Sequence, residues 1–202
     1  MKTTALTIIA IAVLAVGSVN FTKAATPKNE VSTTLKNVSN INKIEVHGNV
    51  QVYISDGTQD QVKVYNHYYA ENALVQNQNG VLRISSYKAE KLVVWVTAAD
   101  LRSISAYDNA VVTSFGKLAE IDLSVTLNDN ALAQLDLNGY SANINVNGRA
   151  KANLSGNLAE CELHYDRTSF VNQTNLTADH FVKQERNNIL LAKNDNLVLA
   201  DL

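Results

Sequence analysis

The sequence predicts an all-β fold, a parallel β-solenoid with coils of about 20 residues, and three observations support this. First, the residues beside each expected corner alternate between apolar and polar, as in β-strands. Second, a triplet containing Asn, Asp or Gly precedes each repeated position, which is typical of corners between strands. Third, small or apolar residues recur with spacings of 21, 19, 19 and 20, at Ala110, Ala131, Ala150, Ser169 and Ile189.

The first half of the chain has the same alternation with a looser period. Its expected strands cover residues 44–46, 50–54, 62–64, 81–84 and 92–96. The triplet His47-Gly48-Asn49 is the expected corner between the first two of these strands. Asn79-Gly80 is typical of a tight hairpin turn, so we expect some antiparallel pairing in the N-terminal half.

In the second half, one inward-facing column is expected to form the core. The residues six positions before each repeated position are Ile104, Val125, Ile144 and Leu163, and all are apolar. Cys161, the only cysteine, lies at an even offset from this column, so we interpret it as a small core residue rather than a reactive thiol. With a single thiol, packing and backbone pairing must stabilise the chain in place of an intramolecular disulfide.

The first 24 residues have the layout of a secretory signal peptide. Lys2 precedes an apolar stretch over residues 5–16, which is too short to favour a membrane span. Thr22 and Ala24 provide the small residues required before a cleavage site, so we expect cleavage after Ala24. An uncleaved N-terminal anchor is the alternative, and otherwise no transmembrane segment is expected.

The rest of the chain is expected to form one domain. Pro27 is the only proline, and no Pro- or Gly-rich linker interrupts the sequence. Residues 25–40 are polar and lack sustained periodicity, which predicts a flexible leader. Residues 41–202 carry the alternation and are expected to form a single β-solenoid domain.

Composition and charge argue against several classes of protein. The formal net charge is −2 and the 17 Lys and Arg residues form no cluster, so nucleic acid and anionic membranes are poor partners. The 4 histidines show no pair at metal-ligand spacing, so no metal site is predicted. There is no Gly-rich phosphate loop and no nucleophile elbow, and we predict neither a cofactor nor a catalytic residue.

The corner triplets carry the candidate ligand-binding residues. Paired carboxylates beside arginines are used by polysaccharide-active β-helix enzymes, to hold a cation or for general acid–base catalysis. Corner geometry explains the same residues without a ligand, because Asp and Asn tolerate a left-handed backbone and hydrogen-bond nearby peptide groups. We favour this second explanation. The candidates are Tyr107, Asp108, Asp129, Arg149, Asp166 and Arg167.

A second candidate surface is aromatic. Tyr65, Tyr68 and Tyr69 cluster with His67 in the sequence, and such a cluster can offer a flat surface for stacking a sugar ring. A half-buried strand edge explains the same tyrosines equally well.

Four segments resemble one protein family. They are residues 44–54 with the central His47-Gly48-Asn49, and residues 79–84, 93–96 and 101–112. Through these segments the chain resembles the family called putative auto-transporter adhesin, head GIN domain. Its members are exported bacterial proteins. The resemblance covers essentially the whole chain after the signal peptide, and it implies a right-handed parallel β-helix in the cell envelope.

These observations lead to one functional expectation and two alternatives. We expect an exported, non-catalytic protein of the bacterial periplasm, cell surface or extracellular space that offers an adhesin-like surface to a glycan or a cell-surface protein. The first alternative is a small polysaccharide-active enzyme of the lyase or hydrolase type. The second is a structural module that forms a homo-oligomer by end-to-end stacking through an exposed terminal coil.

Overall fold

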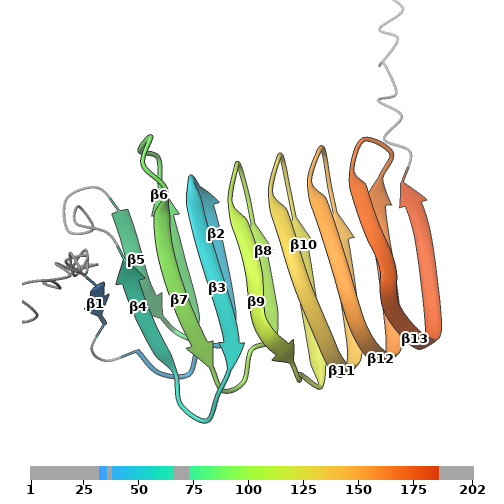
Figure 1. Ribbon diagram of the computed structural model, residues 1–202, viewed down its shortest axis with the longest axis horizontal. Helices are drawn as coiled ribbons and strands as arrows, with labels where there is room; N and C mark the ends of the chain where they lie inside the picture. The colour runs from blue at the N-terminus through green and yellow to red at the C-terminus, as the bar shows by residue number, and fades with distance from the viewer. Residues whose placement is uncertain (1–31, 36–37, 66–72, 187–202) are drawn as a thin grey trace, which may run out of the picture.

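The computed structural model describes residues 32–35, 38–65 and 73–186, and every regular element within these ranges is a strand. Thirteen strands form one strongly curled sheet, elongated in the direction in which the strands stack (Figure 1). They are β1 (Ser32–Thr34), β2 (Lys43–Gly48), β3 (Val50–Asp56), β4 (Gln61–Tyr65), β5 (Ala73–Gln78), β6 (Val81–Ser86), β7 (Leu92–Ala98), β8 (Ser103–Ala106), β9 (Val111–Leu118), β10 (Asp122–Leu127), β11 (Leu132–Val146), β12 (Lys151–Asp166) and β13 (Phe170–Arg186).

The curled sheet has two faces. Face A contains β5, β6, β2, β8, β10 and the C-terminal halves of β11, β12 and β13, and face B contains β1, β4, β7, β3, β9 and the N-terminal halves of the same long strands. The long strands run through both faces: residues 132–137 of β11 pair with β9, and residues 141–146 pair with β10. We call a face A strand, the corner after it and the following face B strand a coil.

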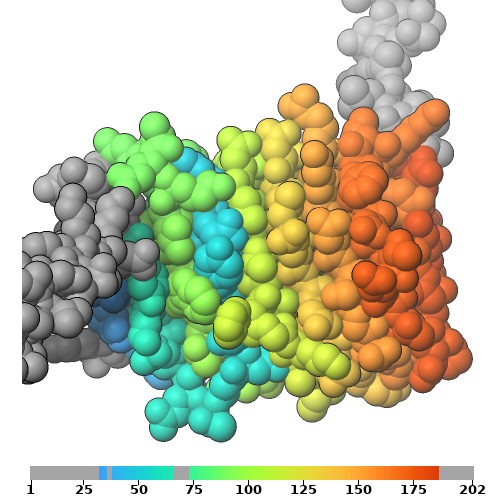
Figure 2. Space-filling model, in the orientation of Figure 1, coloured from blue at the N-terminus to red at the C-terminus, as the bar shows by residue number. Residues whose placement is uncertain are grey.

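Parallel pairing joins neighbouring coils and builds the predicted core column. Ile104 pairs with Val125, Val125 with Ile144, and Ile144 with Leu163. All four side chains are 0% exposed. Because successive strand residues point to opposite sides, this alternation fills the space between the two faces with aliphatic side chains. The coils pack side by side into one continuous body (Figure 2).

The small-residue column at the corners is also buried. Ala110, Ala131 and Ala150 are each 0% exposed, and the backbone N–H of the residue after each later alanine donates to the carbonyl of the preceding column member. Ser169 is half-buried, and its hydroxyl donates to the Asp166 carbonyl at 2.7 Å. Ile189 lies outside the described residues.

The N-terminal end of the sheet is antiparallel. β1 pairs with β4, β4 with β7, and β5 with β6 in this sense. Asn79 and Gly80 close the turn between β5 and β6 with φ angles of 52° and 81°, as the dipeptide predicts. The sheet is therefore mixed rather than parallel throughout. For β5 and β6 the reason is the short turn, which returns the chain antiparallel beside the strand it has just left.

The order of the coils departs from the order of the sequence. β2 lies between β6 and β8, and β3 lies between β7 and β9. The coil formed by β2 and β3 is therefore flanked on both sides by coils that follow it in the chain. A solenoid wound in strict sequence order, which the second half predicts, does not describe this end of the molecule.

The expected leader over residues 25–40 contains one regular element. Ser32–Thr34 form β1, which pairs with Lys63–Tyr65 of β4 as an edge strand. The expected signal peptide over residues 1–24 lies outside the described residues. Within the described ranges, no helix is long and apolar enough to cross a membrane.

Candidate functional site

The corner residues Asp108, Asp129 and Gly148 follow one another along the stack and share a left-handed backbone. Their φ angles are 57°, 59° and 65°. Asp tolerates this conformation better than most residues with a side chain, and Gly adopts it freely. The sequence therefore places at these positions residue types that the corner itself requires.

The three corner carboxylates bind backbone amides of neighbouring coils. An Oδ2 atom of Asp108 accepts a hydrogen bond from the Gly48 N–H at 2.9 Å, and that of Asp129 accepts one from the Asp108 N–H at 3.1 Å. The Asp166 carboxylate accepts from the Gly148 N–H at 2.8 Å, and this residue is only 7% exposed. Each carboxylate thus replaces a missing sheet hydrogen bond where the chain turns.

Asparagine side chains at equivalent corner positions of neighbouring coils also form hydrogen bonds with one another. The Asn147 amide donates to Asn128 Oδ1 at 2.8 Å, and the Asn130 amide donates to Asn109 Oδ1 at 3.3 Å. The Tyr107 ring stacks on the imidazole ring of His47.

Tyr107 and His47 form a parallel ring stack, with centroids 4.4 Å apart and planes inclined by 1°. Of the six predicted ligand-binding residues, four therefore have structural partners: Tyr107, Asp108, Asp129 and Asp166. Arg149 and Arg167 are exposed on successive coils. The structure brings the predicted set together along one ridge, and the carboxylates within it are bound to peptide groups.

Only part of the predicted tyrosine cluster can be placed. Tyr65 ends β4 and pairs with Val93 of β7 and Ser32 of β1, which makes it a half-buried strand residue. Tyr68, Tyr69 and His67 lie outside the described residues.

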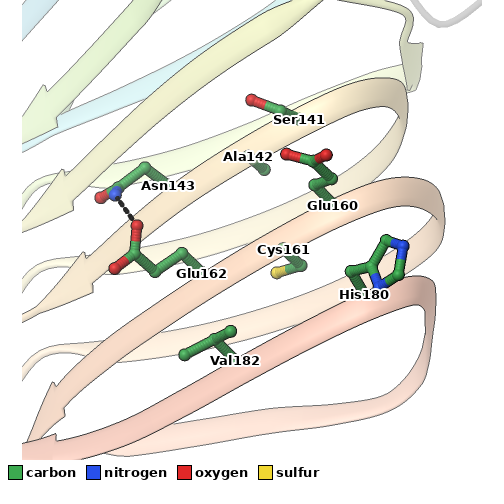
Figure 3. Close-up of a pocket in the computed structure, with 8 residues that line it drawn as sticks. All are labelled: Ser141, Ala142, Asn143, Glu160, Cys161, Glu162, His180 and Val182. Carbon is green, nitrogen blue, oxygen red and sulfur yellow. Dashed lines mark hydrogen bonds between the residues drawn. The ribbon is translucent and has the colours of Figure 1, made fainter.

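Face A carries a shallow groove of about 310 Å³ at the C-terminal end of the stack (Figure 3). Glu160 and Glu162 of β12 project into it, with Ser141 and Asn143 on one side and His180 and Val182 on the other. The Asn143 amide donates to Glu162 Oε2 at 2.9 Å. Sequence reasoning missed this groove, although the alternation of Glu160, Glu162 and His164 is visible in the sequence and places them on one side of a strand.

Both glutamates of this groove have partners within the protein. His164 Nε2 lies 2.7 Å from Glu162 Oε1, and the Tyr140 hydroxyl donates to Glu160 Oε1 at 3.2 Å. This contact with the Glu160 carboxylate raises the pKa of Tyr140. Beneath the groove, Cys161 is 2% exposed, as predicted for a core residue, and burial raises the pKa of its thiol to about 11.

Face B carries an aromatic cluster that sequence reasoning also missed. Trp95 stacks on Tyr53 with centroids 4.7 Å apart, and its ring lies 5.2 Å from that of Phe115. Phe115 is 64% exposed. The three residues come from β7, β3 and β9, which lie side by side in the sheet (Figure 1). An exposed aromatic cluster on a sheet surface is typical of a binding surface.

A second shallow groove, of about 280 Å³, continues along face B toward the C-terminal end. Its lining is made of hydroxyl and amide side chains with a single carboxylate, that of Asp136. The amides are those of Gln134, Asn153, Asn172 and Asn175. Face B thus combines exposed aromatic rings with a nearly uncharged, hydrogen-bonding groove.

The described part of the chain thus combines an all-β fold with open, shallow grooves on its two outer faces. The family model described as putative auto-transporter adhesin, head GIN domain matches residues 40–183. The chain therefore belongs to this family. No curated protein matches it.

Solved structures of bacterial proteins share the fold. A putative adhesin from Bacteroides fragilis matches with a TM-score of 0.67 at 18% identity, over 78% of this chain and 76% of the other. A protein from Parabacteroides distasonis described as a putative lipid binding protein has a TM-score of 0.61 at 7% identity, over 77% and 78% of the two chains. A putative adhesin from Parabacteroides merdae has a TM-score of 0.58 at 14% identity, over 77% of each chain.

Proposed function

We propose that this chain is an exported, non-catalytic protein of the bacterial envelope that binds a glycan or a cell-surface protein through its outer faces, as an adhesin does. Membership of the head GIN domain family and the adhesin descriptions of the related structures support this proposal. In the same proposal, the stacked coils form a right-handed parallel β-helix of about 20 residues per coil. The parallel pairs β8–β10, β10–β11, β11–β12 and β12–β13 support it.

The observation that carries the proposal is the bonding of the corner carboxylates. A general acid or base must reach the proton it transfers. The carboxylates of Asp108, Asp129 and Asp166 instead accept hydrogen bonds from backbone N–H groups that would otherwise lack partners at the corners. This arrangement favours a structural role for these residues over the polysaccharide-active enzyme. The exposed Arg149 and Arg167 are the members of the predicted set best placed to contact a ligand.

Binding and turnover can be measured on the same preparation. The full chain would be expressed in a bacterium, recovered after export and labelled for binding to immobilised glycans and extracellular proteins. The same sample would be incubated with neutral and acidic polysaccharides while chain length is followed. We expect saturable binding and no depolymerisation. Depolymerisation that disappears in Asp129→Asn would establish the polysaccharide-active enzyme. The absence of any saturable binding would instead favour the structural stacking module.

A further inference from the structure

One row of side chains runs across face B through six strands. In the register of the sheet, the consecutive cross-strand pairs are Trp95 with Tyr53, Tyr53 with Thr113, Thr113 with Gln134, Gln134 with Asn153, and Asn153 with Asn172. We call these six residues the face B row. At about 4.8 Å per strand, its five steps span about 24 Å. Trp95, Tyr53, Gln134 and Asn153 each lie between two buried residues of their strand, and pairing in register places Thr113 and Asn172 on the same outer side.

One end of the face B row is aromatic and exposed. Trp95 and Tyr53 stack at 4.7 Å with planes inclined by 28°, and Phe115 leans against Trp95 at 5.2 Å. The Phe115 side chain is 64% exposed although it is wholly apolar. Aromatic rings presented in this way can stack against the C–H face of a sugar ring.

The other end of the face B row offers free amide groups. Among the described residues, no hydrogen bond or ion pair uses the side chain of Gln134 or Asn153, and both line the groove of about 280 Å³. Asn172 Oδ1 accepts hydrogen bonds from Thr174, which leaves its NH₂ group available for donation. An amide both donates and accepts, as a sugar hydroxyl does, so the two are complementary without any net charge.

Several polar groups of face A, in contrast, are paired with one another. Glu45 forms ion pairs with Lys43 at 3.4 Å and Arg83 at 3.0 Å. Glu162 is bound by Asn143 and His164. The face B row differs because its amides lie together in one groove beside the aromatic rings.

We propose that the face B row binds a neutral polysaccharide chain that lies across the strands, with sugar rings on Trp95, Tyr53 and Phe115 and hydroxyl groups on Gln134, Asn153 and Asn172. This inference rests on the proposed function and names its ligand class and its site. A protein partner would favour a continuous apolar centre, whereas half of this row is amide. An acidic polysaccharide would favour cations, and the groove lining contains none.

The single tryptophan of the chain makes the site directly observable. Intrinsic fluorescence of the exported full chain would be titrated with soluble neutral polysaccharides (α-glucan, β-glucan, mannan and galactan) and with acidic ones (alginate and polygalacturonate). We expect a saturable change in Trp95 emission with a neutral polymer, and tighter binding of its hexasaccharide than of its disaccharide, because the row spans about 24 Å.

Variants at both ends of the face B row test the assignment. Phe115→Ala and the double variant Gln134→Ala with Asn172→Ala remove exposed groups, and each should weaken binding by about tenfold. Tyr140→Ala and Gln76→Ala remove an exposed aromatic and an exposed amide on face A and should leave the affinity unchanged. Thermal unfolding of each variant confirms that the fold is intact.

The outcomes separate this proposal from the broader one. Binding of a neutral glycan that neither row variant weakens would overturn the face B row as the site, but would leave the proposed binding function standing. Binding of acidic polymers alone, or of immobilised proteins alone, would have the same meaning. If the exported chain binds none of the glycans and none of the proteins, both proposals fail. A fluorescence change that persists unaltered in Phe115→Ala and in the amide double variant counts against the row even when binding is strong.

Discussion

The Asp129 carboxylate accepts a hydrogen bond at 3.1 Å from the backbone N–H of Asp108, the residue that occupies the same corner position one coil earlier. Both residues have a left-handed backbone, with φ angles of 59° and 57°. The Asp129 side chain therefore helps to fix the backbone of the preceding corner in the stack. This side chain thus bonds to a neighbouring coil, whereas the left-handed backbone of Asp129 forms the corner of its own coil.

Replacing Asp129 should separate the role of its oxygen from that of its charge. Asn keeps an acceptor oxygen and tolerates the left-handed backbone, so Asp129→Asn should cost less than about 1 kcal/mol of unfolding free energy. Asp129→Ala loses both features and should cost about 2 kcal/mol. Urea denaturation measures both values. The control Asp100→Ala removes an exposed ion pair with Arg102 and should leave the stability nearly unchanged. Equal losses in the Asn and Ala variants would contradict the proposed role.

The inward column should tolerate no charge. Val125 is 0% exposed between Ile104 and Ile144, so Val125→Asp would bury an unpaired carboxylate and should cost several kcal/mol, enough to unfold a marginal domain. Ser124→Asp lies next to it on the same strand but is exposed, and it should leave the thermal midpoint nearly unchanged. Circular dichroism during heating compares the two. Similar midpoints for both variants would show that the column does not face the core.

Two glycines with a left-handed backbone should respond differently to alanine. Gly116 has a φ of 84° and open space around its position for a Cβ, so Gly116→Ala should cost only about 1 kcal/mol of conformational strain. Gly156 has a φ of 112°, and a Cβ there would overlap the Leu137 carbonyl oxygen of the neighbouring coil. Gly156→Ala should therefore be several times more destabilising in urea denaturation. The reverse ranking would mean that the two coils do not approach each other closely at Gly156.

Cys161 should make stability depend on pH in the alkaline range. Burial raises the pKa of its thiol from 9.0 to about 11, so the thiolate forms more readily in the unfolded chain. The stabilisation is complete below pH 9 and is lost as the pH rises toward 11, by about 2 kcal/mol. Urea midpoints of the wild type and Cys161→Ala at pH 8, 9.5 and 11 isolate this contribution from other titrating groups. A constant difference between the two proteins across this range would exclude it.

The same burial predicts slow chemical modification. In the folded protein the thiol is 2% exposed and protonated at pH 8, so iodoacetamide should alkylate it only in the presence of denaturant. Mass spectrometry after short exposure measures the extent of alkylation. Rapid alkylation without denaturant would place Cys161 outside the core.

The sequence was sufficient to predict those features that depend on neighbouring residues or on a constant spacing. Alternation and the spacing of 21, 19 and 19 predicted the column of Ile104, Val125, Ile144 and Leu163, because parallel in-register strands align residues at the same offset. Asn79-Gly80 predicted its hairpin, since both residues readily adopt positive φ angles. The corner explanation for Asp108 and Asp129 depended on the same conformational preference.

The aromatic cluster and both grooves could not be predicted in this way. Tyr53, Trp95 and Phe115 become neighbours because β3 lies between β7 and β9, a strand order that departs from the order of the sequence. Pairing of strands that are distant in sequence depends on the tertiary fold rather than on local preference. Glu160 and Glu162 were visible as an alternating pair, and His180 pairs with Glu160 from the next strand, β13, one repeat later.

The position of β2 and β3 between later strands has a consequence for how the chain assembles. In the second half, each coil pairs with residues 19 to 21 positions away, so coils can be added one after another from a growing edge. Gln51, in contrast, pairs with Val111, which follows 60 residues later. Closing such a long loop is entropically costly and slow. The C-terminal coils can therefore form early, whereas β2 and β3 complete their pairing last, once both neighbouring coils are in place.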